Sequence, residues 1–355
     1  MSTGSGSWTH GSALVGEERD GRPGGVAAGD ATTGGAPVER SEWTAAGGDL
    51  VAAVDFGGTK IAGALVDGSG QVYARCRRPT PARADAETIM ASVAEVVAEL
   101  TAAPQWSRVR AVGVGSAGPI DAVHGTVSPV NVPAWRGFPL APRIAELAGG
   151  LPTVLTGDGV AMTAAEHRWG AARGEDDALC FVVSTGVGGG LVLGGRLLPG
   201  RTGNAGHLGH ITVDFDGEPC VCGGTGCVEQ LASGTSIARW ARENGWRPAG
   251  EDASAAAVAQ DARRGEPVAL AAFDRAGRAL AGAIAATATL VEIRVAVIGG
   301  GVAAAGEVLF EPVRRHLDDY ATLSFARGVN VVPATLGGDA GLIGAAAAAA
   351  VELSL

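Results

Sequence analysis

A short glycine-rich turn between apolar runs occurs twice in this chain, and this repeat constrains the fold more than any other feature. The first copy, Phe-Gly-Gly-Thr-Lys at residues 56–60, separates Leu50–Asp55 from Ile61–Asp67. The second copy, Thr-Gly-Val-Gly-Gly-Gly at residues 185–190, follows Ala178–Ser184 about 130 residues further on. Apolar runs joined by a glycine turn are typical of a β-hairpin. The repeat predicts a duplicated α/β architecture, and a cleft between the two halves is then the default binding site.

Further apolar patterns fill in both halves. Buried-strand patterns occur at Gln71–Arg77, Val109–Val114, Thr153–Leu155 and Val295–Ile298. Helical spacing or composition occurs at Asp85–Thr101, Pro139–Leu147, Val160–Ala171, Ala255–Gly265, Val268–Ala288 and Ala340–Leu353. Strands that alternate with helices favour sheets covered by helices.

Composition excludes several classes of protein. With 46% hydrophobic residues, the chain as a whole is not disordered, although the glycine-rich residues 1–49 have no hydrophobic periodicity and predict a disordered tail. The net charge is −10 and no Lys/Arg cluster occurs, which argues against nucleic acid as a partner. The N-terminus does not resemble a signal peptide, and no run of about 18 apolar residues could span a membrane. We therefore expect a soluble, cytoplasmic protein.

The glycine turns have the composition of phosphate-binding loops. A turn of Gly and Thr leaves several N–H groups unpaired and has no Cβ in the way, so it can hold phosphates without a lysine. Asp55 ends the first apolar run, where it could hold Mg²⁺ through water. A single Gly-Gly hairpin is most often structural, but two such turns with Thr59 and Thr185, and a third glycine run at Gly299–Gly301, favour a nucleotide site. Walker A and dinucleotide-binding motifs are absent.

Three of the five cysteines lie close together in the sequence. Cys220, Cys222 and Cys227 follow His210, and three thiolates with one imidazole can form a closed tetrahedral zinc site. Closed sites are structural, so this zinc would fold a loop and would not activate water. Three buried thiols or a labile disulfide is the alternative.

Together these motifs resemble the ROK kinases (repressor, open reading frame, kinase) of the actin-like sugar kinase fold. The resemblance covers residues 50–355 and is most specific at Gly206–Gly234. The matching motifs are Asp55–Lys60, Ser184–Gly189, Gly209-His210, Cys220-x-Cys222-Gly-x-x-Gly-Cys227-x-Glu229, Ala232–Gly234, Gly299–Gly301 and Asp339–Gly344.

The resemblance implies two α/β lobes of an actin-like ATPase around a cleft. The small lobe would span residues 50–156 and be joined by the C-terminal helix within 340–355. The large lobe would span 157–339 and include a zinc loop at 207–230. A homodimer is also implied, because dimers are common in the family.

The resemblance further implies ATP-dependent phosphorylation of a primary hydroxyl on a sugar-like acceptor. Asp158 falls where the family keeps its catalytic base, and a carboxylate there can accept the hydroxyl proton. ATP and Mg²⁺ would be held by Asp55, Gly57, Gly58, Thr59, Lys60, Thr185, Gly186, Gly188 and Gly300. The acceptor would be bound by Asn131, Asp158, His207, His210 and Glu229, with His210 also binding the structural zinc.

Two departures from the family pattern concern the acceptor. Family sugar kinases usually have Asn before the base and Glu three residues before the zinc histidine, whereas this chain has Gly157 and His207. Both missing groups normally bind hexose hydroxyls, so their loss predicts weaker selection of glucose. We therefore expect a sugar-like acceptor such as a C7-cyclitol ketone (valienone or validone) phosphorylated at its 7-hydroxyl, as by the C7-cyclitol kinases of aminocyclitol antibiotic biosynthesis. A glucokinase that tolerates both changes is the alternative.

A sugar-responsive transcriptional regulator of the same family is the alternative from another class. Such regulators carry a helix-turn-helix before the first phosphate motif and often lack the base. Residues 1–49 show no apolar helix pattern, and Asp158 is present, so the sequence favours a kinase.

Overall fold

The first glycine turn joins two strands of a five-stranded mixed sheet, sheet A. The computed structural model describes Trp43 and residues 48–355, and the described residues fall in one compact unit. Sheet A has the order β3-β2-β1-β4-β7, in which β1 is antiparallel to β2 and parallel to β4. Its strands are β1 (Leu50–Phe56), β2 (Lys60–Asp67), β3 (Val72–Pro79), β4 (Val109–Ser116) and β7 (Thr153–Gly157).

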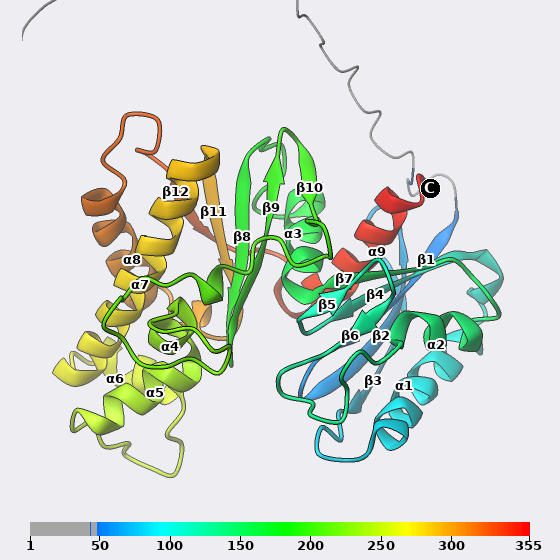
Figure 1. Cartoon of the computed structure of the whole chain (residues 1–355), viewed down its shortest axis with the longest axis horizontal. Helices are drawn as coiled ribbons and strands as arrows, with labels where there is room; N and C mark the ends of the chain where they lie inside the picture. The colour runs from blue at the N-terminus through cyan, green and yellow to red at the C-terminus, as the bar shows by residue number, and fades with distance from the viewer. Residues whose placement is uncertain (1–42, 44–47) are drawn as a thin grey trace, which may run out of the picture. The chain divides into compact units, whose positions relative to one another are not determined.

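The second glycine turn lies at the corresponding position of a second five-stranded sheet, sheet C (Figure 1). Its order is β10-β9-β8-β11-β12, with β8 antiparallel to β9 and parallel to β11. Its strands are β8 (Ala178–Val183), β9 (Val187–Leu193), β10 (Arg196–Leu198), β11 (Val295–Gly299) and β12 (Asn330–Pro333). If the strands of each sheet are numbered in the order in which they occur along the chain, both sheets have the spatial order third, second, first, fourth, fifth. The predicted duplication is therefore confirmed, and with it the actin-like α/β fold.

Helices cover both sheets. In sheet A, α1 packs on β2 and β3, whereas α9 packs on β1 and β4; in sheet C, α3 packs on β8 and β9. The helices are α1 (Ala86–Thr101), α2 (Leu140–Leu147), α3 (Asp158–Trp169), α4 (Val228–Ala232), α5 (Gly234–Glu243), α6 (Ala255–Arg263), α7 (Pro267–Val291), α8 (Glu307–Tyr320) and α9 (Ala340–Glu352). A small hairpin, β5 (Ile120–Asp121) and β6 (Thr126–Val127), and a 3₁₀ turn at Leu208–His210 complete the parts used below.

Helices α3 and α9 pack against each other between the two sheets (Figure 1). Two glycines allow this arrangement. A Cβ on Gly344 of α9 would overlap the backbone carbonyl of Ala161 in α3, and a Cβ on Gly113 of β4 would overlap that of Ala345. The alanine-rich α9 is buried along almost its whole length, so one apolar core continues from sheet A to sheet C.

Most predicted elements are present, with shifted ends. Helix α3 begins at Asp158, two residues earlier than expected, and β7 extends to Gly157, one residue past the lobe boundary expected at 156. Helices α4 and α5 and strands β10 and β12 were not among the expected elements. Among the described residues, no helix is both long and apolar enough to cross a membrane.

The tail expected over residues 1–49 is wrong at Trp43. The Trp43 side chain is only 3% exposed and packs edge-on against Trp169, and its carbonyl accepts a hydrogen bond from Arg168 Nη2 at 2.6 Å. An indole ring buries a large apolar area, which explains why this position packs. The prediction also fails at Gly48 and Asp49, because Arg108 Nε donates to the Gly48 carbonyl at 2.6 Å and Arg110 Nε donates to Asp49 Oδ1 at 2.9 Å. The rest of that prediction, at residues 1–42 and 44–47, falls outside the described part of the chain.

Candidate active site

Asp158 lies at the junction where β7 of sheet A passes into α3. Its Oδ1 accepts a hydrogen bond from the Gly159 N–H at 2.7 Å. Solvent reaches the carboxylate, but the protein around it limits its hydration. This loss of hydration raises the pKa of Asp158 to about 6, and the negative charge of Asp55 contributes to the increase. A pKa near 6 leaves the carboxylate ionised at neutral pH but more basic than an ordinary aspartate, as general base catalysis requires.

Asp55 is the second carboxylate of the site and lies near the end of β1. Burial raises its pKa, and the nearby Lys60 charge opposes the increase. Glycines make room for it, because a Cβ on Gly341 would lie 3.1 Å from Asp55 Oδ2 and one on Gly115 would lie 3.5 Å from Oδ1. A half-buried carboxylate with a raised pKa fits a magnesium site, since a bound cation would stabilise its charged form.

Asn131, which is predicted to bind the acceptor, lies directly against the first hairpin turn. The Gly57 N–H donates to the Lys60 carbonyl at 3.0 Å and closes the turn, and Thr59 and Lys60 are exposed. A Cβ on Gly58 would overlap the Asn131 amide. The sequence-predicted Asn131 is therefore placed on the predicted phosphate turn.

The second hairpin turn repeats this arrangement with Glu229. The Val187 N–H donates to Glu229 Oε2 at 2.8 Å, and a Cβ on Gly186 would lie 2.6 Å from the same oxygen. A Cβ on Gly188 would lie 3.8 Å from Asp158 Oδ1, so the Asp158 carboxylate faces this hairpin. Both turns thus have a glycine where a side chain predicted to bind the acceptor comes close, Asn131 at the first turn and Glu229 at the second.

The predicted adenosine-side glycine lies behind the second hairpin. Gly300 has a φ of +88°, and a Cβ there would overlap the Val183 carbonyl at the end of β8. The N-terminus of α5 closes in from another side, where the Gly234 N–H donates to the Ser184 carbonyl at 2.7 Å and Thr235 Oγ1 donates to the Thr185 carbonyl at 3.2 Å. Thr235 was not among the residues predicted from the sequence, although a short run of small polar residues at the start of a helix is a usable signal.

His207 and His210, both predicted to bind the acceptor, stack on each other. Their ring centroids are 5.5 Å apart, with planes inclined by 25°. Burial and the neighbouring His210 lower the pKa of His207, whereas Glu229 opposes the decrease. A neutral imidazole can both donate and accept a hydrogen bond, which suits recognition of a hydroxyl or carbonyl.

The predicted zinc ligands come together. One ligand atom from each of His210, Cys220, Cys222 and Cys227 lies within 4.8 Å of the others. His210 Nδ1 is 3.8 Å from Cys220 Sγ, and Cys222 Sγ is 3.7 Å from Cys227 Sγ. With Nδ1 turned to the thiols, Nε2 is the nitrogen left for a substrate. The four donors and their spacing fit a tetrahedral zinc ion.

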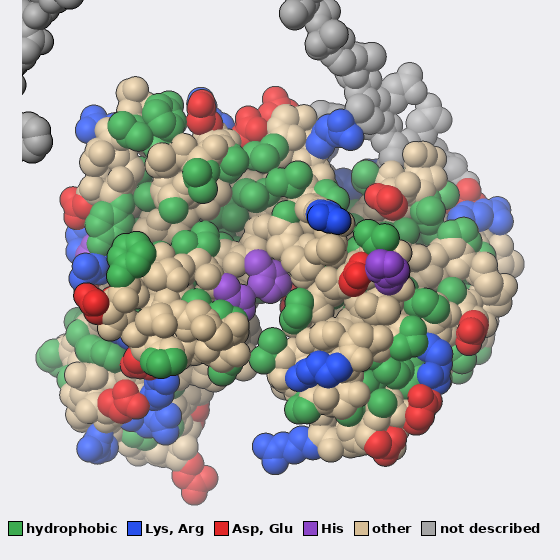
Figure 2. Space-filling model, viewed as in Figure 1, with side chains coloured by type: hydrophobic (Ala, Val, Ile, Leu, Met, Phe, Trp, Pro, Cys, Tyr) green, Lys and Arg blue, Asp and Glu red, His purple; other side chains and the backbone are tan. Residues whose placement is uncertain are grey.

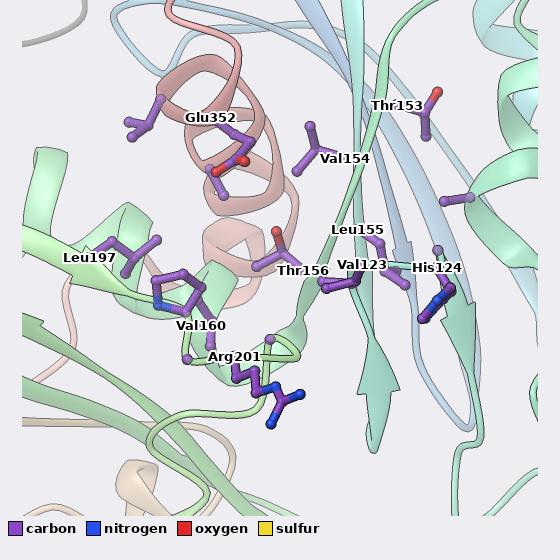
Figure 3. Close-up of a pocket in the computed structure, with 18 of the residues that line it drawn as sticks. Val123, His124, Thr153, Val154, Leu155, Thr156, Val160, Leu197, Arg201 and Glu352 are labelled. Atoms are coloured by element: carbon purple, nitrogen blue, oxygen red, sulfur yellow. The ribbon is translucent and has the colours of Figure 1, made fainter.

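The structure also has a cavity of about 590 Å³ (Figure 3). None of the site residues predicted from the sequence lines it. Its walls come from β7, α2, the C-terminal end of α9 and the segment after β10, and include Thr156, Val160 and Arg201. Thr156 and Val160 flank Gly157 and Asp158 in sequence, so the cavity lies behind the end of β7. On the face shown in Figure 2, basic side chains are scattered among acidic ones and form no continuous patch.

Two mixed sheets of identical strand order, each with a glycine hairpin between its first two strands, define a duplicated actin-like ATPase fold. The sequence model of the ROK family matches residues 51–352. The chain therefore belongs to the ROK family.

Individual relatives agree with this assignment. A glucokinase from Thermotoga maritima is 37% identical over 305 residues, covering 82% of this chain and 95% of the relative. An N-acetylmannosamine kinase from Escherichia fergusonii is 37% identical over 294 residues, covering 83% and 96%. The crystal structure of a ROK family glucokinase from Streptomyces griseus in complex with glucose and AMPPNP is 35% identical, with a TM-score of 0.71, covering 84% of this chain and 98% of that one.

Proposed function

We propose that this protein transfers the γ-phosphate of ATP to the primary hydroxyl of a sugar-like acceptor. The observation that carries the proposal is the position of Asp158 at the end of β7, facing the second glycine hairpin and within electrostatic reach of Asp55. The chain is an ATP-dependent phosphotransferase with an alcohol group as acceptor, as its family relatives indicate. The presence of the base favours this activity over a regulatory role.

Asp158 acts as the general base in this proposal. Its carboxylate accepts the proton of the acceptor hydroxyl as the oxygen attacks phosphorus, and such a group contributes about 10²–10⁴-fold to the rate. The hydrogen bond from the Gly159 N–H holds Oδ1 at the start of α3, which leaves Oδ2 to receive the proton.

The two hairpins hold the nucleotide phosphates. The backbone N–H groups of Gly58, Thr59, Thr185 and Gly186 face the phosphates, whereas those of Gly57 and Val187 are donated to Lys60 and Glu229. Gly300 borders the adenosine. Asp55 holds the magnesium ion through water, and the ion neutralises charge that develops on the phosphate oxygens. Lys60 is exposed beside Asp55 and adds positive charge at the first hairpin.

His210, Cys220, Cys222 and Cys227 hold a structural zinc ion in this proposal. The ion fixes the loop that carries His210 and leads into Glu229 at the start of α4, so it acts on the acceptor side without taking part in phosphoryl transfer.

Treatment with a strong chelator should release about one zinc per chain, because the four ligands form one closed site. Loss of the ion frees the acceptor-side loop, so kcat/KM for the acceptor falls in parallel with zinc content. Metal analysis and kinetics on the same samples measure this. Cys76→Ala is the matched control, since Cys76 is buried in the small lobe and should leave the zinc content unchanged. Full activity in the zinc-free protein would contradict the proposed role.

The acceptor we propose is a C7-cyclitol ketone such as valienone or validone, phosphorylated at its 7-hydroxyl in aminocyclitol antibiotic biosynthesis. The proposal is supported by Gly157 and His207, which replace two hydroxyl-binding groups that family hexose kinases usually have. Glucose is the second candidate acceptor, and the identities to glucokinases favour it. A homodimer is proposed from the family alone, and light scattering of the purified protein tests it.

Restoring the two missing groups tests the acceptor directly. In the double variant Gly157→Asn/His207→Glu, we expect kcat/KM for glucose to rise roughly 10- to 100-fold, because each hydrogen bond contributes about 0.5–1.5 kcal/mol. The substitution at Gly157 is sterically feasible, since a Cβ there would lie 3.2 Å from the Gly203 carbonyl and needs only a small shift of that loop.

Steady-state kinetics on glucose and on the cyclitol ketone measure the effect, and the KM for ATP is the internal control, because neither position is assigned to the nucleotide in this proposal. If the double variant gains nothing on glucose, these two positions do not determine the choice of acceptor.

A further inference from the structure

The side chain of Asn204 pairs with the backbone of Ile120 in the way a neighbouring β-strand would. Its Oδ1 accepts from the Ile120 N–H at 3.1 Å, and its Nδ2 donates to the Ile120 carbonyl at 2.7 Å. Ile120 begins β5, in the segment between β4 and β7 of sheet A, whereas Asn204 lies in the segment after β10 of sheet C. One amide thus joins segments from the two halves of the fold.

The surrounding loop is built for this contact. Asn204 Nδ2 also lies 3.0 Å from Thr202 Oγ1, and the Ala122 N–H donates to the Thr202 carbonyl at 3.0 Å. Gly203 has a φ of +90°, and a Cβ there would lie 2.7 Å from Ile120 Cδ1. Only a glycine therefore lets residues 202–204 lie this close to β5.

Both segments joined by Asn204 lead to acceptor-side residues. On one side, His207 follows three residues later, and a Cβ on Gly118 would lie 3.1 Å from its Cε1. On the other side, the Gly118 carbonyl accepts from the Val130 N–H at 3.3 Å, next to Asn131. The contact at Asn204 therefore fixes the His207 loop relative to the Asn131 loop.

We propose that Asn204 is a positioning residue that holds His207 at the acceptor site by pairing with Ile120. It touches neither acceptor nor nucleotide, so its contribution is to acceptor affinity and not to phosphoryl transfer. This inference rests on the proposed kinase function, because it assigns a role at the acceptor site.

Two substitutions remove the pairing in different ways. Asn204→Ala removes both hydrogen bonds, whereas Asn204→Asp keeps an acceptor for the Ile120 N–H but places a carboxylate oxygen against the Ile120 carbonyl. For both variants we expect the KM for the acceptor to rise roughly 10-fold. In Asn204→Ala the cause is the loss of two neutral hydrogen bonds, and in Asn204→Asp it is the loss of one together with the repulsion between the carboxylate and the Ile120 carbonyl. The kcat and the KM for ATP should stay within about twofold of wild type. Asn244→Ala is the matched control, because Asn244 Nδ2 caps the Trp240 carbonyl at the end of α5.

A double-mutant cycle separates positioning from general loosening. If Asn204 acts through His207, Asn204→Ala should add little to the acceptor KM in a His207→Ala background, since interacting residues are non-additive. Equal factors in both backgrounds, or an unchanged acceptor KM in Asn204→Ala, would overturn the proposal.

Hydrogen exchange provides a readout that does not depend on activity. In Asn204→Ala, amides in residues 118–123 and 199–208 should exchange faster than in wild type and in Asn244→Ala. Unchanged exchange in both segments would also overturn the proposal. If wild type phosphorylates no acceptor while hydrogen exchange in Asn204→Ala rises as expected, the kinase proposal fails. The inference that Asn204 holds the two loops together then still stands.

Discussion

Replacing Asp158 with asparagine should lower kcat by about 10²–10⁴-fold, because the amide cannot accept the hydroxyl proton. The hydrogen bond to the Gly159 N–H survives through the amide oxygen, so the start of α3 keeps its geometry. Binding of ATP should be unaffected, since the phosphate turns are built from backbone groups. The measurement is kcat together with the KM values for both substrates. Substantial turnover in a correctly folded Asp158→Asn protein would remove this residue from the role of base.

The wild-type pH profile belongs to the same prediction. Activity requires the ionised carboxylate, so kcat should rise through an acid limb centred near pH 6, the pKa that limited hydration and the charge of Asp55 give to Asp158. The raised pKa of Asp158 also makes stability depend on pH, but whereas kcat rises with pH, the contribution of this group to stability falls. A carboxyl whose pKa is higher in the folded state than in the unfolded state loses stabilising free energy as pH rises from about 4 to about 6. At pH 7, Asp158→Asn should therefore be no less stable than wild type.

The largest effect on stability is expected for Glu166→Ala. The Glu166 side chain is fully buried on α3 and accepts from three backbone N–H groups: Ala171 at 2.7 Å, Thr335 at 3.0 Å and Leu336 at 3.0 Å. Truncation leaves these donors without an acceptor, and each such loss costs about 1–3 kcal/mol. We expect the free energy of unfolding to fall by about 3 kcal/mol or more, measured by urea denaturation.

An exposed glutamate serves as control for this variant. Glu307→Ala removes an ion pair with Arg314 whose partners are 75% and 45% exposed, and exposed pairs contribute about 0–1 kcal/mol. If Glu166→Ala and Glu307→Ala destabilise the protein equally, the buried carboxylate does not tie α3 to the segment before α9.

The features that were predictable from the sequence are those that leave a local pattern. The two glycine hairpins can be recognised by the apolar runs on either side of each turn. The identical strand order of the two sheets confirms the duplication that these hairpins implied. The zinc-type ligands are likewise close in sequence, from His210 to Cys227, and converge within 4.8 Å. Asp158 follows a short apolar strand directly, and it begins the next helix.

What the sequence could not reveal depends on contacts between distant residues. Two of the three backbone partners of Glu166, Thr335 and Leu336, lie 169 and 170 residues away in sequence, and Ile120 lies 84 residues from Asn204. Helix α5 was not predicted, because it begins with glycine, which has low helix propensity. Trp43 stands alone in a glycine-rich stretch, so only its packing on Trp169 shows that this position is part of the fold.

The most direct test of the proposed function is a kinase assay with purified protein, ATP and Mg²⁺ on valienone or validone, glucose and N-acetylmannosamine, with the phosphorylated position determined by NMR. The proposal predicts ATP-dependent phosphorylation of the cyclitol ketone at its 7-hydroxyl, with the highest kcat/KM of the series. Efficient turnover of glucose with none of the cyclitol ketone would contradict the acceptor we assign, and no ATP-dependent phosphorylation of any of them would contradict the proposed activity itself.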